Sequence, residues 1–122
     1  MTFADLITGD AVFLDTNIFV YHFAPDPLLR SPCSQLLQRI ERQDISGYTS
    51  TVILSEVAHR LMTIEARTRP GWPSGKIVNR LKQNPAAVQS LMNFRIAVQN
   101  ILHSKIQVLT IAPPRYRFSI SR

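Results

Sequence analysis

Cysteine is almost absent from this sequence, since Cys33 is the only one among 122 residues. A single cysteine cannot form an intrachain disulfide, so nothing indicates a disulfide-stabilised secreted fold. No uncharged apolar stretch approaches the ~20 residues that a membrane-spanning helix needs. The segment from Met1 to Asp10 also lacks the basic region and apolar run of a secretory signal. These absences predict a soluble, cytoplasmic protein.

Acidic residues are missing from the chain after Glu65. All eight lie at or before Glu65, where only four arginines accompany them, so residues 1–65 carry a net charge of −4. Residues 66–122 contain ten Lys or Arg and no acid, which gives +10 and accounts for the +6 of the whole chain. A basic region opposite an acidic site would attract RNA. A solvated basic surface that binds nothing specific explains the same charges equally well.

Short apolar segments alternate with helical patterns along the chain. Residues 11–14, 47–50 and 106–111 have the composition of strands. Helical spacing follows each of the first two, with Ser50 or Thr51 as the cap of the second of these helices. Further helices are expected to begin at Ser31, before Pro32, and at residues 84–85. This alternation predicts a single α/β domain over residues 1–122 with a parallel sheet.

Two carboxylates are distinguished by their positions. Asp15 follows the first expected strand, and Glu56 lies early in the helix after the second. In a parallel sheet both would lie at the same edge. Two ionised carboxylates 4 Å apart repel by about 4 kcal/mol at an effective dielectric near 20, so such a pair needs a shared proton or a cation such as Mg²⁺. The alternative is that Asp15 only caps a helix and Glu56 only pairs with Arg60.

The sequence resembles the PIN-domain ribonuclease family, the fold of VapC-type toxins. The segment at residues 12–21, VFLDTNIFVY, is similar to the opening motif of the family, and STVILSEV at residues 50–57 is similar to its second motif. The two acids are separated by 41 residues, as in the family, and the resemblance covers roughly residues 12–111.

The resemblance implies a three-layer α/β fold and a Mg²⁺- or Mn²⁺-dependent endoribonuclease. It makes Asp15 and Glu56 the catalytic metal ligands, with Thr16 and Asn17 supporting them through hydrogen bonds. RNA as substrate, an antitoxin protein as partner and a homodimer are also implied. His22, His59 and His103 lack the spacing of metal ligands.

The sequence departs from the family after its third expected strand, where the remaining acids of the family would lie. We therefore expect a PIN-like fold that is incomplete at the C-terminus, with three strands, weak metal binding and little RNA cleavage. A catalytically inactive module that binds RNA or an antitoxin is the alternative. The first strand is expected at an edge of the sheet, and residues 115–122 are expected to begin a helix or to fray. Truncation of a longer gene, or completion by a partner chain, would explain this pattern.

Overall fold

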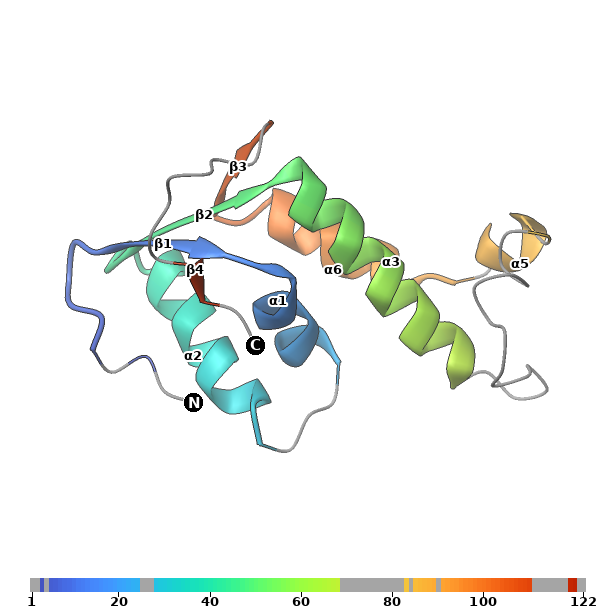
Figure 1. Ribbon diagram of the computed structural model, residues 1–122, viewed down its shortest axis with the longest axis horizontal. Helices are drawn as coiled ribbons and strands as arrows, with labels where there is room; N and C mark the ends of the chain where they lie inside the picture. Colours follow the sequence, from blue (N-terminus) through green and yellow to red (C-terminus); the bar gives the residue numbers. More distant parts are fainter. Residues whose placement is uncertain are drawn as a thin grey trace.

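The computed structural model describes residue 3 and residues 5–24, 28–68, 83, 85–89, 91–110 and 119–120. Its elements follow in the order β1 (Ala11–Leu14), α1 (Thr16–Phe23), α2 (Arg30–Glu41), β2 (Ser46–Ser50), α3 (Thr51–Arg67), α5 (Pro85–Gln89), α6 (Asn93–Leu102), β3 (Gln107–Leu109) and β4 (Ser119–Ile120) (Figure 1). Residues 69–82 and 111–118 lie outside the described part of the chain, and with them the last residue of the strand expected at 106–111.

The strands form one parallel sheet in the order β3-β2-β1-β4. Val12 of β1 aligns with Gly47 of β2, and Thr49 of β2 aligns with Val108 of β3. The expected α/β fold with a parallel sheet is therefore confirmed. Because all strands run the same way, their carboxyl ends lie along one edge, where the residues that follow each strand come together.

The fourth strand corrects two expectations. The sheet was expected to have three strands, and the first strand was expected to lie at its edge. β4 pairs with β1, with Phe13 aligned to Ser119 and Leu14 to Ile120, so β1 lies between two strands. The expected helix or frayed end at residues 115–122 is likewise wrong for Ser119 and Ile120. A strand of two residues carries no period-two pattern, and for that reason the sequence did not reveal it.

The hydrophobic core lies between one face of the sheet and the helices. From β1 to β2 and from β2 to β3, the chain moves across the sheet in the same direction. Because crossovers between parallel strands are almost always right-handed, the helices of both crossovers lie on the same face of the sheet. A helical layer on the other face, as a three-layer fold has, is not found among the residues that the structure describes.

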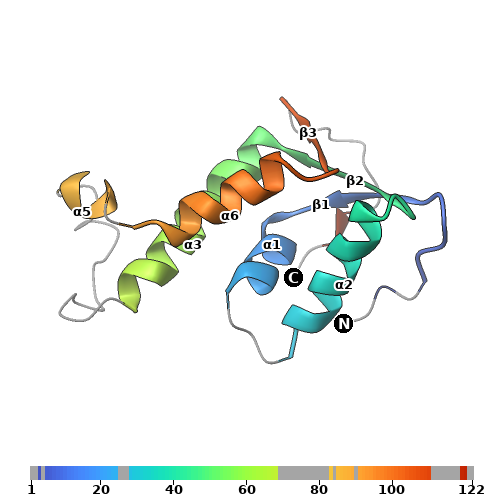
Figure 2. The same ribbon diagram turned by 180° about the vertical axis from the view of Figure 1, so that it is seen from behind.

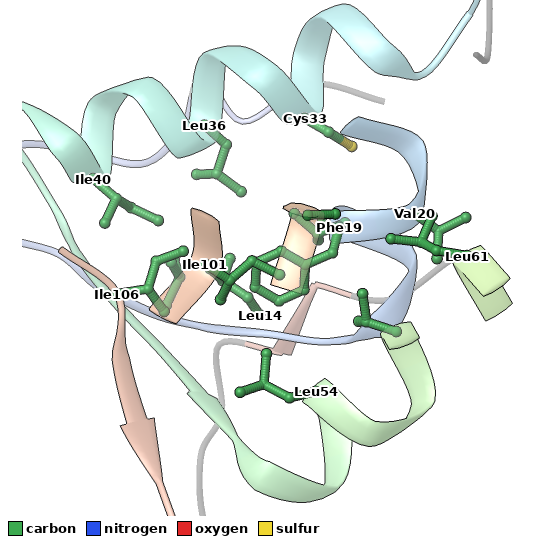
Figure 3. Packing of buried hydrophobic residues seen from close by; sticks show 14 of the residues in the cluster. Leu14, Phe19, Val20, Cys33, Leu36, Ile40, Leu54, Leu61, Ile101 and Ile106 are labelled. Atoms are coloured by element: carbon green, nitrogen blue, oxygen red, sulfur yellow. The ribbon is translucent and has the colours of Figure 1, made fainter. Parts of the chain in front are cut away.

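One cluster of buried side chains unites these elements. From β1 it takes Val12 and Leu14, whereas Phe13 between them points to the other face of the sheet and is not part of the cluster. In Figure 3, Leu36 and Ile40 of α2 lie opposite Leu14. The other buried members are Ile18, Phe19, Val20, Cys33, Ile45, Leu54, Val57, Leu61, Ala97, Ile101 and Ile106.

The start of α6 is set by a side chain from α3. The Glu65 carboxylate accepts hydrogen bonds from the backbone N–H groups of Met92, Asn93 and Phe94, at 3.2, 3.1 and 3.1 Å. These N–H groups have no acceptor within their own helix. The single helix expected from residues 84–85 is accordingly two helices, α5 and α6. From both sides of the molecule, α6 is seen to run beside α3 (Figures 1 and 2).

The start of α2 also differs from expectation. The helix begins at Arg30 with Leu29 as its N-cap, so Ser31 lies inside the first turn and is not the cap. Pro32 is tolerated there because a helix leaves its first N–H groups without an acceptor.

Candidate functional site

The carboxyl edge of the sheet is held together by hydroxyl groups. The Thr49 hydroxyl donates to the carbonyl of Leu14 at 3.0 Å, which joins the end of β1 to β2. The Ser50 side chain accepts the N–H of Ile53 at 3.2 Å and caps α3, as the sequence predicted. The Thr51 hydroxyl donates to the carbonyl of Thr110 at 3.1 Å and so fixes the residue after β3. These hydrogen bonds fix the ends of β1, β2 and β3 relative to one another, and so fix the backbone of the residues that follow them.

Asp15 lies directly after β1, at the N-cap position of α1. Its backbone is extended, and it occupies the N-cap position that the sequence indicated, but its side chain makes no capping hydrogen bond. The residue is partly buried. The Oδ1 oxygen of its carboxylate is shielded from solvent and accepts no hydrogen bond, although the residue takes part in other interactions. Asp15 therefore lies at the carboxyl edge, at the N-cap of α1, with a side chain that is not used in a capping hydrogen bond.

Glu56 reaches the same place from α3. The buried hydroxyl of Thr16 donates a hydrogen bond of 2.7 Å to Oε2 of Glu56. Thr16 is the first residue of α1, so the Glu56 carboxylate lies at the positive end of that helix, where a negative charge is favourable. The structure thus fixes Glu56 next to the residue that follows Asp15 in the chain.

A second hydrogen bond links the same two helices. The Nη1 group of Arg60 donates to Oδ1 of Asn17, between α3 and α1. No ion pair between Glu56 and Arg60 is found in the part of the chain that the structure describes. The alternative reading of Glu56, as a surface pair with Arg60, is therefore wrong. Thr16 and Asn17 both make hydrogen bonds to α3, one to each of these residues.

An open depression of about 360 Å³ lies beside Glu56 and is lined by Ser55, Glu56, His59 and Arg60. All four side chains are exposed. The sequence had offered Arg60 only as a partner of Glu56, and His59 only as a histidine without ligand spacing. Residues three and four positions apart share one face of a helix. This spacing from Glu56 was the signal that could have assigned His59 and Arg60 to its surroundings.

The described residues offer no large cluster of metal-ligating side chains. Within them, no group of three or more His, Cys, Asp or Glu side chains is arranged to hold a metal ion. His22 lies elsewhere, within hydrogen-bond distance of Ser34, 2.6 Å from its hydroxyl oxygen, and burial together with nearby Arg30 lowers its pKa. His103 is exposed at the end of α6. Neither of these two histidines lies beside Asp15 or Glu56.

No helix among the described residues combines the length and apolar character needed to cross a membrane. Comparisons with models of protein families, with curated proteins and with solved structures found no match to this chain.

Proposed function

We propose that this chain is a PIN-type, VapC-like ribonuclease domain that binds Mg²⁺ or Mn²⁺ weakly between Asp15 and Glu56 and cleaves RNA slowly or not at all. The observation that carries the proposal is the hydrogen bond of 2.7 Å between the Thr16 hydroxyl and Glu56. It joins the start of α1 to α3 at the edge of the sheet where Asp15 also lies. The sequence motifs around residues 15 and 56 supply the rest of the support.

The donor set suits a hard divalent cation. Both residues offer carboxylate oxygens, and Mg²⁺ commonly binds through one or two carboxylates while it keeps several waters. The chemistry that such a cation supplies is neutralisation of phosphate charge and activation of a water for hydrolysis. Thr16 orients Glu56 through Oε2, which leaves Oε1 without a hydrogen bond among the described residues.

Weak binding and slow turnover follow from the small number of acids. No Asp or Glu follows Glu65 in the sequence, and Glu65 itself binds the N-terminus of α6. With two carboxylates alone, little holds the water and the phosphate in a reactive geometry. RNA as substrate, a cytoplasmic location, an antitoxin protein as partner and a homodimer belong to the same proposal.

The second candidate is a catalytically inactive module that binds RNA or an antitoxin protein. The observation in its favour is the charge of residues 66–122, which have ten basic side chains and no acid. Such a segment favours a polyanionic partner without any need for hydrolysis. Measurement of metal binding separates the two candidates.

The test is a Mn²⁺ titration followed by electron paramagnetic resonance, with RNA cleavage measured in parallel. We expect weak binding by the unaltered protein and its loss in Asp15→Asn. Asp5→Asn is the matched control, because Asp5 is exposed and lies outside the site. Absence of Mn²⁺ binding would leave only the inactive module. Rapid metal-dependent cleavage that Asp15→Asn abolishes would show that two carboxylates suffice and that the expected low activity is wrong.

A further inference from the structure

The depression beside Glu56 is also lined by two nitrogen-bearing side chains, His59 and Arg60, that have no role in the proposed cation site. Its lining comes from one face of α3, where His59 and Arg60 lie about one turn beyond Glu56. One turn of helix advances ~5.4 Å. A ligand that reaches the carboxylate pair therefore also lies within reach of these two side chains.

Arg60 is held in place before any ligand binds. One of its guanidinium N–H groups donates to Asn17 of α1, which orients the side chain across the junction of α1 and α3. A guanidinium has five N–H donors, so four remain after this contact. None of them forms an ion pair with a carboxylate among the described residues. The charge of Arg60 is therefore available to an anion, and its geometry suits two oxygens of a phosphate.

The neighbouring groups in the depression are also compatible with a phosphate. The imidazole of His59 makes no hydrogen bond within the part of the chain that the structure describes, and Ser55 offers a hydroxyl from the same lining. The Glu56 carboxylate, the one negative group in the lining, is engaged by Thr16 on its Oε2 side.

We propose that this depression is a subsite for a phosphate of single-stranded RNA, with the Arg60 guanidinium as its charged contact. The proposal rests on the proposed function, because it makes the bound phosphate a neighbour of the one that would meet the cation between Asp15 and Glu56. Asn17 is then a positioning residue, since it acts through Arg60. This subsite binds the RNA strand beside the point of cleavage.

The test measures binding of a labelled single-stranded RNA oligonucleotide by fluorescence anisotropy at several salt concentrations, in EDTA. Neutralising one phosphate contact changes the slope of log Kobs against log salt by about 0.7 for a single strand, which corresponds to about a fivefold loss of affinity at 0.1 M salt. We expect both changes in Arg60→Gln. Arg60→Lys retains the charge and should retain the slope.

Arg67→Gln is the matched control, because Arg67 is an exposed arginine at the end of the same helix, outside the depression. An Arg60→Gln variant that is folded by circular dichroism and loses no more affinity than Arg67→Gln overturns the subsite. Absence of RNA binding by the unaltered protein overturns it as well. Because EDTA removes divalent cations, neither result depends on the carboxylate pair. The Mn²⁺ titration of Asp15→Asn tests the proposed function independently.

Discussion

Substitution of Thr16 by valine tests the hydrogen bond on which the site depends. The two side chains have a similar shape and are both branched at Cβ, so packing and helix propensity change little. The change removes the donor to Glu56, while Thr16 itself is only 7% exposed. An intramolecular hydrogen bond contributes about 1 kcal/mol on balance, and water can replace the donor at the exposed Glu56 carboxylate. We therefore expect stability to fall by about 1 kcal/mol, or roughly 4 °C in Tm.

The same substitution should weaken metal binding. Without the Thr16 hydroxyl, the Glu56 side chain regains rotamer freedom, and ordering it again on binding costs about 1 kcal/mol. Affinity for Mn²⁺ should then fall about fivefold. The assays are thermal unfolding followed by circular dichroism and the Mn²⁺ titration.

Thr63→Val provides the control. Thr63 is 8% exposed, and its hydroxyl donates to the carbonyl of His59 at 2.9 Å, within α3. The same chemical change therefore removes a hydrogen bond that joins no two elements. We expect Thr63→Val to leave Mn²⁺ affinity unchanged. Equal losses of affinity in the two variants, or no loss in Thr16→Val, would refute the role assigned to the bond between α1 and α3.

Three further outcomes concern stability. Burial, helped by Arg30, lowers the pKa of His22, so the unfolded chain binds this proton more tightly than the folded protein does. The contribution of His22 to folding stability is complete above the pKa of the unfolded chain, about 6.5, and declines as pH falls below that value. The urea midpoint of unfolding should therefore decrease over that pH range, and it should decrease less in His22→Gln. Glu65→Ala removes the acceptor of three N–H groups of α6 and should cost about 1–2 kcal/mol in urea unfolding. In Gly47→Ala the new Cβ would lie 2.5 Å from Cδ1 of Ile40; we expect a loss of about 1–3 kcal/mol, partly relieved by adding Ile40→Val.

Local signals in the sequence predicted the elements that depend on local interactions. The apolar segment at residues 11–14 is β1, and Ser50 caps α3 through its own side chain, three residues from its donor. In both cases the residues that determine the structure are neighbours in the chain. Pattern and capping chemistry were sufficient there.

Elements that depend on distant contacts could not be predicted in the same way. The break between α5 and α6 is associated with Glu65, whose carboxylate binds Asn93, 28 residues further along the chain. β4 exists through its pairing with β1, more than 100 residues earlier, and its own two residues carry no strand pattern. The sequence shows which groups need partners, but it does not show which distant group supplies them.

The candidate site combines both situations. Position relative to the strands indicated one edge for Asp15 and Glu56, and the family resemblance implied supporting hydrogen bonds from Thr16. Thr16 does donate to Glu56, whereas the alternative pair of Glu56 with Arg60 is not found among the described residues. An exposed pair of this kind stabilises a helix by only about 0.2–0.5 kcal/mol. The fold replaces it with two hydrogen bonds that tie α3 to α1, one from Thr16 to Glu56 and one from Arg60 to Asn17.

This exchange of partners has a chemical consequence for the site. If Arg60 paired with Glu56, the guanidinium would offset the negative charge that a cation requires, and it would also lose the orientation that suits a phosphate. With Asn17, a neutral side chain, as its partner, Arg60 keeps its full charge, and a neutral hydroxyl holds Glu56 without cancelling its charge. Opposite charges therefore stand about one helical turn apart on α3, each with a neutral partner from α1. A phosphodiester bridged by a divalent cation is a ligand that can interact with both charges at once. The two variants should therefore affect different measurements: Thr16→Val should change metal affinity, and Arg60→Gln should change the salt dependence of RNA binding.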